Sequence, residues 1–368
     1  MEPQIRLPDD IAAGVLRERR RGRGAASNRT GRFEPQARVE IDDGWETGGE
    51  LPPFRTEVRL EAARKIITRN DSPDIGFDRS INPYRGCEHG CVYCFARPTH
   101  AFLGLSPGLD FEARLTAKPN AAELLRRELS APGYQPRTMA LGTNTDPYQP
   151  IEREHRITRS VLEVLAETGH PVGIVTKSSL VARDIDILGP MAARGLAKVA
   201  ISVTTLDPVL ARRMEPRAPT PSRRLETVRR LADAGIPVSV LFAPVIPALN
   251  DHETERVLDA ARAAGAGEAG YVLLRLPLEI KDLFQEWLVE HYPDRAQRVM
   301  SLIRETRGGK AYDARWGKRM TGDGAYAWTV GRRFELAARR LGLNARRLKL
   351  RTDLFTPPPR PGEQLALF

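Results

Sequence analysis

Only three cysteines occur among the 368 residues, and all of them lie between positions 87 and 94. A disulfide framework needs an even number of cysteines spread along a secreted chain, so this distribution excludes one and favours metal ligation. The sequence also lacks any run near the roughly 18 apolar residues of a membrane span, and its start lacks the apolar segment of a secretion signal. We therefore expect a cytoplasmic protein without a membrane partner.

Acidic residues are fewer than basic ones, 47 against 57, which gives a formal net charge of +10 at pH 7. Such an excess favours polyanionic partners, nucleic acid above all, but a solvated basic surface has the same composition. Hydrophobic residues make up 41% of the chain, as in a globular protein. Composition alone leaves the partner open.

Pattern divides the chain into three parts. Residues 1–55 carry glycine, proline and charge without periodicity, which predicts an irregular N-terminal extension. Residues 56–306 alternate short apolar runs with amphipathic segments and form the predicted core. Residues 307–368 form a basic, aromatic C-terminal extension in which residues 334–341 have a helical pattern.

The predicted core contains six strands separated by helices. Five strands are continuous apolar runs, as in parallel strands buried on both faces, and are expected at residues 139–143, 172–176, 199–204, 238–242 and 271–274. A shorter candidate strand at residues 79–82 leads into the cysteine loop. Helical patterns occupy residues 121–129, 158–167, 222–234 and 253–264. This alternation predicts a parallel α/β fold, either an open six-stranded barrel or a doubly wound sheet. Both place functional residues at the carboxyl ends of the strands.

The cysteine loop follows the first of these strands, and its spacing is Cys87-x3-Cys91-x2-Cys94. Three thiolates can each bind one iron of a [4Fe–4S] cluster, and the fourth iron stays open because the chain has no other cysteine. One alternative is a zinc ion held by the three cysteines and His89 or His100, although closed zinc sites usually use two separated Cys-x2-Cys pairs. Another alternative is three buried, unreactive cysteines.

This loop resembles the signature of the radical-SAM superfamily. The neighbouring sequence resembles the spore-photoproduct-lyase-like branch and, more closely, the bacterial proteins known as PA0069-type radical-SAM proteins, through residues 82–87, 145–152, 176–178 and 215–217. The resemblance covers roughly residues 56–285. It implies a partial (β/α)6 barrel, a [4Fe–4S] cluster and S-adenosylmethionine, which takes an electron from a donor such as flavodoxin or ferredoxin and yields a radical that abstracts hydrogen from a substrate.

Polar residues at two strand ends are candidates for binding the methionine end of S-adenosylmethionine. The resemblance places Thr145 and Asp146 where relatives bind its amino group, although Asp146-Pro147 also fits an ordinary turn. Lys177, after the next strand, suits a carboxylate or ribose contact, or a side chain that extends to solvent. The resemblance also places Arg224 on the methionine carboxylate, which a guanidinium binds through two parallel hydrogen bonds.

Ser202 and Thr204 share one face of their strand, because alternate residues of a strand point the same way. They are candidates for the ribose hydroxyls, although threonine is common in strands in any case. Unlike spore photoproduct lyase, the chain has no further cysteine to return hydrogen to a product radical. Tyr84, Tyr93 and Tyr148 are possible donors, but a structural role is the better explanation of each.

The C-terminal extension interleaves cations with aromatic rings, including Trp316 and Trp328. Phosphates pair with cations and bases stack on rings, so this pattern suits single-stranded nucleic acid. It also suits a cap on the open side of the barrel, with arginines facing solvent and tryptophans packed inward. The leading hypothesis is a radical-SAM enzyme acting on nucleic acid. The alternatives are modification of a protein or small molecule, and an Fe–S or zinc protein that binds nucleic acid without turnover.

Overall fold

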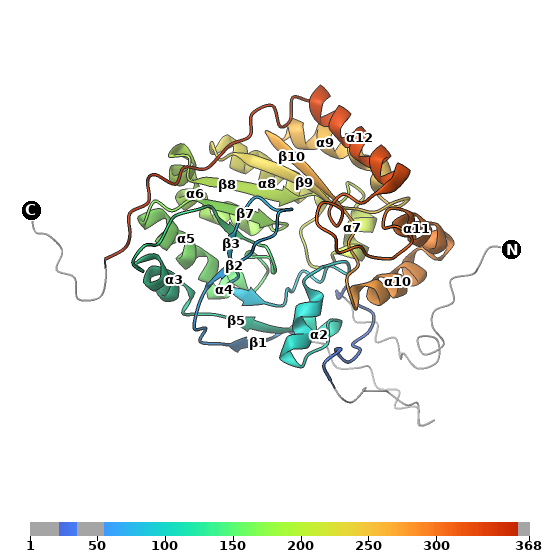
Figure 1. Ribbon diagram of the computed structural model, residues 1–368, viewed down its shortest axis with the longest axis horizontal. Coiled ribbons are helices and arrows are strands. Elements are labelled where there is room, and N and C mark those ends of the chain that lie inside the picture. Colours follow the sequence, from blue (N-terminus) through green and yellow to red (C-terminus); the bar gives the residue numbers. More distant parts are fainter. Residues whose placement is uncertain (1–21, 35–54, 360–368) are drawn as a thin grey trace, which may run out of the picture.

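The computed structural model describes residues 22–34 and 55–359. Its centre is a seven-stranded sheet in the order β10-β9-β8-β7-β6-β3-β2 (Figure 1). The six strands from β3 to β10 are parallel to their neighbours, while β2 is antiparallel to β3 at one edge. Their bounds are β2 Ile67–Arg69, β3 Arg79–Ile81, β6 Met139–Leu141, β7 Val172–Thr176, β8 Ala197–Ser202, β9 Val238–Val245 and β10 Glu268–Leu273. The two edges do not pair, which confirms the open, partial (β/α)6 barrel.

Helices cover the outer side of this sheet (Figure 1). Those of the barrel are α3 Ala121–Leu129, α4 Glu152–His155, α5 Ile157–Glu167, α6 Ile185–Ala193, α7 Pro208–Met214, α8 Pro221–Asp233 and α9 Thr254–Ala263. Helices α10 Ile280–His291, α11 Pro293–Glu305 and α12 Gly324–Arg340 follow it. The predictions for α3, α5, α8 and α9 are confirmed to within a residue or two, because each has leucine or valine on one face at helical spacing. The predicted helix 334–341 begins earlier, at Gly324.

The strands are buried fully on one face only. In β7, Val172, Ile174 and Thr176 are buried, whereas Gly173 and Val175 between them are half-buried. β8 and β9 begin with the same alternation. The buried row packs against the helices, and the other row faces the concave side of the barrel. The prediction of strands buried on both faces is therefore wrong for the concave side, because an open barrel does not fill its interior.

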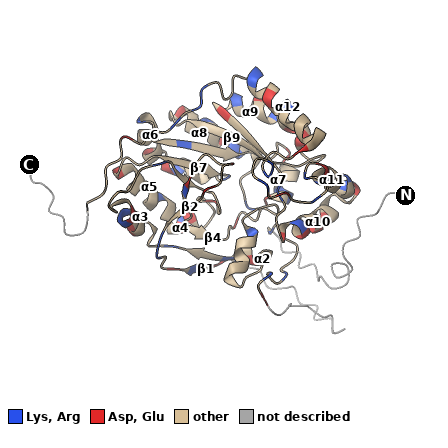
Figure 2. Ribbon diagram, in the orientation of Figure 1, with Lys and Arg blue, Asp and Glu red and all other residues tan. Residues whose placement is uncertain are grey.

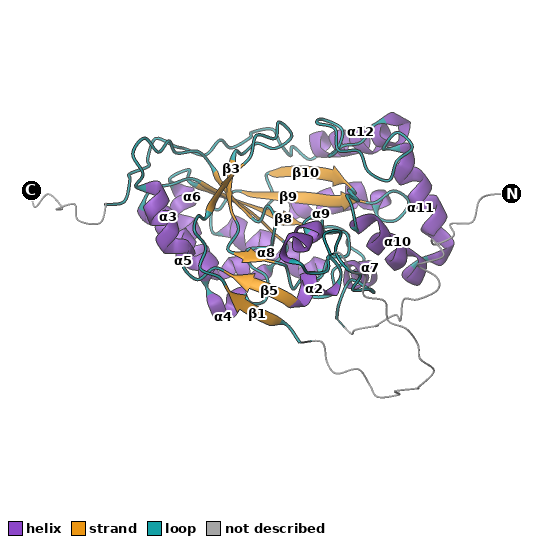
Figure 3. Ribbon diagram, turned by 60° about the horizontal axis from the view of Figure 1, so that its bottom comes forward, coloured by secondary structure: helices purple, strands orange, loops and turns teal. Residues whose placement is uncertain are grey.

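A second, three-stranded sheet joins the barrel near the cysteine loop, in the order β1-β5-β4. It contains β1 Glu57–Leu60, β4 Tyr84–Arg85 and β5 Arg114–Ala117, and Figure 3 shows β1 and β5 side by side next to the short helix α2 Leu109–Ala113. This sheet was not predicted, because its strands are short and β1 is largely exposed. Its strand β4 ends at Arg85, directly before Gly86 and Cys87, and so fixes the start of the cysteine loop.

The predicted N-terminal extension is irregular where the structure describes it, at residues 22–34; residues 1–21 and 35–54 of that prediction lie outside the described residues. The final described segment crosses the amino ends of the strands. The Arg351 N–H donates to Gly195 O at 2.9 Å and the Thr356 N–H to Thr168 O at 2.9 Å, just before β8 and β7. The last described residues thus lie along the amino ends of β7 and β8. The proposed boundaries at residues 55 and 306 stay predictions.

The capping interpretation also expected tryptophans packed inward, and that part is wrong. Trp316 is 55% exposed and Trp328 is 70% exposed. Many arginines of the region are paired instead, for example Arg333 with Glu255 at 2.6 Å and Arg340 with Asp259 at 2.9 Å. Figure 2 shows the resulting mixture of basic and acidic segments along α9 and α12. No helix in the described ranges is both long and apolar enough to cross a membrane.

His170 contacts the C-terminal segment through Phe355, and its burial predicts that the stability of the protein depends on pH. The ring packs edge-on against Phe355, and its Nε2 lies 2.9 Å from the Tyr134 hydroxyl. Burial lowers the pKa of His170 from 6.5 to about 4. Between these pH values His170 is protonated in the unfolded chain but stays neutral in the folded protein. The free energy of unfolding therefore falls as pH drops from about 6.5 to about 4, and His170 contributes roughly 3 kcal/mol to this fall.

The measurement is urea unfolding at several pH values for the wild type and for His170→Gln, which does not titrate. The difference between their free energies of unfolding isolates this residue from the other acid-sensitive groups. We expect that difference to change between pH 6.5 and 4 and to be flat below. A constant difference over the whole range would contradict the prediction.

Candidate cofactor site at the cysteine loop

The backbone of the cysteine loop is held by the second sheet and by α2. The Cys87 N–H donates to Phe111 O at 2.9 Å, and the Cys94 N–H donates to Cys91 O at 3.2 Å. Gly86 has a φ of +73°, and a Cβ there would lie 2.8 Å from Phe111 O. A glycine is therefore required where β4 turns into the loop.

Arg97 holds the cysteine loop in place through hydrogen bonds to its backbone. Its side chain is fully buried and donates to Cys91 O at 2.8 Å and Gly90 O at 3.2 Å. The same guanidinium donates to Pro107 O, Gly108 O and the buried carboxylate of Glu112, the last at 2.5 Å. Five donated hydrogen bonds saturate the group, so one side chain fixes both the loop and the segment before α2. The ion pair of Arg97 and Glu112 was not predicted, because nothing in the sequence distinguishes Arg97 from a surface arginine.

The N-terminal extension completes this support. The backbone N–H groups of Gly24 and Ala25 donate to Glu112 at 2.9 and 2.8 Å. A Cβ at Gly24 would lie 1.8 Å from Gly90 O, so this backbone passes directly against the cysteine loop. Residues that looked like an irregular extension thus hold the loop from its outer side.

The three cysteines have the properties of cluster ligands. All are free thiols; Cys87 and Cys91 are buried and Cys94 is partly exposed. Burial raises the pKa of Cys87, with further contributions from Asp146, Cys91 and Cys94, and burial raises that of Cys91 to about 12. Such thiols lose their protons when iron binds, since the metal and not the protein stabilises the thiolate.

A single metal ion does not fit the same residues. Nowhere in ranges 22–34 and 55–359 do three His, Cys, Asp or Glu side chains converge as ligands of one ion. His89 Nδ1 instead lies 3.3 Å from Asp146, and His100 Nε2 lies 2.9 Å from Arg114 O. The zinc alternative therefore lacks its fourth ligand. A cubane cluster needs three thiolates on three separate irons, and the loop provides them.

Thr145 and Asp146 lie next to the loop at the end of β6. The Thr145 hydroxyl donates to Tyr84 O at 3.1 Å, and Asp146 accepts from Thr176 at 2.6 Å and from the Lys177 N–H at 2.9 Å. Burial alone would raise the pKa of Asp146, but His89 and these hydrogen bonds lower it to about 2. Asp146 therefore ties the ends of β6 and β7 to the cysteine loop. Its contact with S-adenosylmethionine stays a prediction.

A buried carboxylate, Glu215, links the loop to β8 and α8. It accepts from Tyr93, from Thr204 at 2.7 Å and from Arg224. Burial alone would raise its pKa, but Arg224 and Lys177 lower it to about 2. The sequence motif 215–217 included Glu215, yet nothing in the sequence assigned it this central position.

Arg224 itself is only 1% exposed, and its other nitrogens donate to Pro219 O at 2.8 Å and Ser202 O at 3.1 Å. Every nitrogen of its guanidinium is thus engaged within the protein. The geometry gives Arg224 the role of a positioning residue, and its direct contact with the methionine carboxylate stays a prediction.

Lys177 and Ser202 extend this cluster towards the concave side. The Lys177 Nζ lies 5.6 Å from the centre of the Tyr93 ring, and burial alone would lower its pKa. The neighbouring Cys91 and Glu215 raise it instead, so the ammonium stays charged beside the loop. Five of the six predicted cofactor-binding residues therefore lie at the ends of the neighbouring strands β6, β7 and β8, and Arg224 reaches Ser202 O from helix α8. Their contacts with the cofactor stay predictions.

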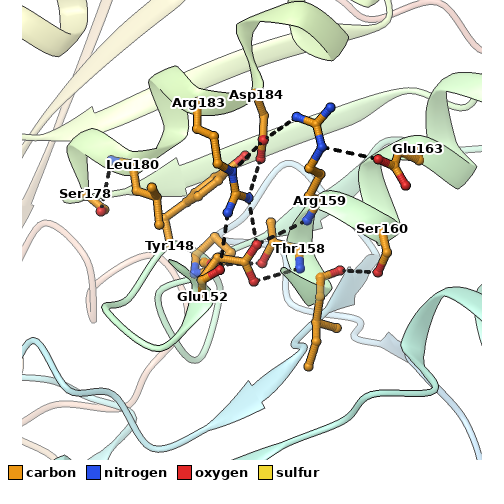
Figure 4. A network of polar contacts seen from close by, with 12 residues as sticks. Tyr148, Glu152, Thr158, Arg159, Ser160, Glu163, Ser178, Leu180, Arg183 and Asp184 are labelled. Atoms are coloured by element: carbon orange, nitrogen blue, oxygen red, sulfur yellow. Dashed lines mark hydrogen bonds and ion pairs between the residues drawn. The ribbon is translucent and has the colours of Figure 1, made fainter. Parts of the chain in front are cut away.

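Figure 4 shows a network of polar contacts that follows β6 and β7 in the chain. The sequence did not indicate it. Arg183 donates to Glu152 at 2.7 Å and to Asp184 at 2.8 Å, and Glu152 also accepts from Tyr84 at 2.5 Å. The Tyr148 hydroxyl is buried beside Asp184. The network fixes the segment 145–152 that follows β6.

Comparisons with known proteins identify the family of this site. The sequence profile of the radical SAM superfamily matches residues 81–261, which contain the cysteine loop and the strands from β4 to β9. An uncharacterised protein of Mycobacterium tuberculosis is 38% identical over 230 residues, 62% of this chain and 68% of that protein. The chain belongs to the radical SAM superfamily. Its cofactors are therefore a [4Fe–4S] cluster and S-adenosylmethionine.

One further relative and one solved structure are also similar to this chain. A protein of Pseudomonas phage M6 named radical SAM Nα-GlyT isomerase is 27% identical over 240 residues, 62% of this chain and 46% of that protein. The structure of spore photoproduct lyase complexed with dinucleoside spore photoproduct is similar in fold, with a TM-score of 0.54 and 15% identity over 78% of this chain and 80% of that chain. The narrower likeness to PA0069-type proteins stays a prediction.

Proposed function

We propose that this radical SAM protein is an enzyme that abstracts a hydrogen atom from a nucleic acid or nucleotide substrate. The observation that carries the enzymatic part is the loop of three free thiols, held rigidly by Arg97 at the carboxyl ends of the barrel strands. When bound, the cluster and S-adenosylmethionine supply one-electron cleavage of the sulfonium and a 5′-deoxyadenosyl radical, with the electron from a donor such as flavodoxin or ferredoxin.

The residues around the loop orient the cofactor and exclude water. Lys177 presents a cation beside Cys91, and the saturated carboxylates Asp146 and Glu215 hold the strand ends in a fixed arrangement. Alignment of a reactive carbon with the substrate bond is a problem of proximity, for which rigid supports are effective. Tyr84, Tyr93 and Tyr148 are all buried, so each serves the support of the site.

Two observations support the substrate class. The net charge of +10 favours a polyanion, and Trp316 and Trp328 are 55% and 70% exposed, so their rings offer stacking surfaces. A protein of the same fold binds a dinucleoside. The basic C-terminal region can contact nucleic acid through these exposed rings.

Anaerobic reconstitution tests the enzymatic part. The protein, given iron, sulfide, dithionite and S-adenosylmethionine, is expected to form 5′-deoxyadenosine, measured by chromatography. The control Cys91→Ala lacks one ligand and should form none. Absence of 5′-deoxyadenosine from a preparation with a full cluster would refute the proposal.

The substrate class is tested in cells with and without this gene. Nucleosides from digested DNA and RNA are compared by mass spectrometry, alongside a profile of small metabolites and peptides. A nucleoside that depends on the gene supports the proposal, whereas a change confined to peptides or metabolites overturns the nucleic-acid part.

A further inference from the structure

A hollow on the outer side of the cysteine loop is lined mainly by arginines. Its volume is about 390 Å³, and it lies between the loop, the segments that follow β6, β7 and β8, and helix α8. Its basic residues are Arg153, Arg217, Arg223 and Arg230, and Glu226 is its one carboxylate. His89, which stands between the ligands Cys87 and Cys91, forms part of its wall.

The carboxylate that lines the hollow does not neutralise the arginines around it. Glu226 pairs with Arg229, which does not line the hollow, at 3.2 Å. Within the described residues, Arg153, Arg223 and Arg230 have no carboxylate partner. This differs from the C-terminal region, where arginines such as Arg333 are paired. Unpaired arginines gathered around one concavity repel each other, and a bound anion removes that cost.

Arg217 connects the hollow to the cluster loop. Its backbone N–H donates to His89 O at 3.3 Å, and its guanidinium pairs with Glu88 and donates to Gly22 O at 3.1 Å. An anion seated in the hollow therefore lies against the outer side of the loop that holds the cluster. It is anchored on a rigid part of the protein, a few residues from the chemistry.

We propose that this hollow binds a phosphate of the polynucleotide substrate and so fixes the strand relative to the cysteine loop. The inference rests on the nucleic-acid substrate proposed above. A concave site with several guanidinium groups matches a phosphate, whose oxygens accept paired N–H bonds. An acidic electron-transfer protein would need a broad basic face, whereas this charge lies in a hollow. Docking of such a protein is an outcome of the test.

The test compares two double variants that remove the same charge. Arg223→Gln/Arg230→Gln removes two arginines of the hollow, and Arg212→Gln/Arg295→Gln removes two exposed arginines outside it. Binding of a fluorescent 12-residue single-stranded oligodeoxynucleotide is measured over a salt series for the reconstituted proteins. A second probe has the same sequence with neutral methylphosphonate linkages, and free thymidine monophosphate serves as competitor.

We expect the hollow variant to bind the charged oligonucleotide about tenfold more weakly, with a salt slope smaller by about 0.7 for each lost phosphate contact. The control variant should change by less than about twofold, and the neutral probe should bind both variants and the wild type alike. Competition by the monophosphate at similar concentration would assign the site to a free nucleotide instead of a strand. Equal losses in both variants, or none in either, would overturn the inference.

Two further readouts separate this inference from the proposed function. Formation of 5′-deoxyadenosine with dithionite should be equal in all three proteins, because neither Arg223 nor Arg230 is a cysteine ligand or one of the six predicted cofactor-binding residues. If the wild type cleaves S-adenosylmethionine but binds no oligonucleotide even at low salt, the substrate class fails together with the inference, and the enzymatic assignment stands. If the hollow variant loses only reduction by flavodoxin, the hollow is a docking site for the electron donor and the inference is wrong.

Discussion

Replacing Arg97 by methionine is expected to destabilise the protein by about 3–5 kcal/mol and to prevent stable assembly of the cluster. The substitution keeps an unbranched side chain of similar length but leaves Glu112 as a buried charge without its cation. It also removes the donors to Gly90 O and Cys91 O, which fix the turn between two cysteine ligands. Urea unfolding gives the first quantity, and iron and sulfide content after reconstitution gives the second.

Two variants make this prediction sharp. Arg97→Lys keeps the charge but supplies three donors to five acceptors, so it should recover part of the stability and little of the cluster occupancy. The control Arg114→Met lies close by, where an exposed arginine pairs with Asp110 at 3.5 Å. It should cost less than about 1 kcal/mol. Equal effects of Arg97→Met and Arg114→Met would show that Arg97 does not hold the loop.

The sequence was sufficient for the barrel because its signal is local. Strands β6 to β9 are short, mainly apolar runs, and the helices between them carry leucine or valine at helical spacing. The second sheet was not predictable in this way. Its β4 has two residues, and β1 pairs with β5 across more than fifty residues, a contact that no local pattern encodes.

In the candidate site, too, features with a local sequence signal were predicted and features that depend on distant contacts were not. The cysteines were predicted from spacing, and the family resemblance placed Thr145, Asp146 and Lys177 near them, as the structure does. The supports were missed because their meaning depends on partners far away in the chain. Glu112 acts through Gly24 and Ala25, about ninety residues earlier, and a lone glutamate before a strand gives no sign of this.

Replacing Glu215 by glutamine is the second substitution with a large expected effect. It leaves the buried cations Arg224 and Lys177 without their carboxylate and weakens the contacts of Tyr93 and Thr204. We expect a loss of about 3–5 kcal/mol in the free energy of unfolding. Because a matched removal of both charges is tolerated better than removal of one, Glu215→Gln/Arg224→Gln should lose less than the sum of the two single variants.

The same cycle decides what Arg224 does for the cofactor. If Arg224 only positions Glu215 and the Ser202 carbonyl, adding Arg224→Gln to Glu215→Gln should leave the dissociation constant of S-adenosylmethionine within about twofold. If its guanidinium binds the methionine carboxylate, the double variant should bind the cofactor at least tenfold more weakly than Glu215→Gln alone, as loss of a charge-assisted pair requires. Equilibrium binding to the reconstituted proteins measures this ratio, and stability measured in parallel keeps a folding defect from being mistaken for a lost contact.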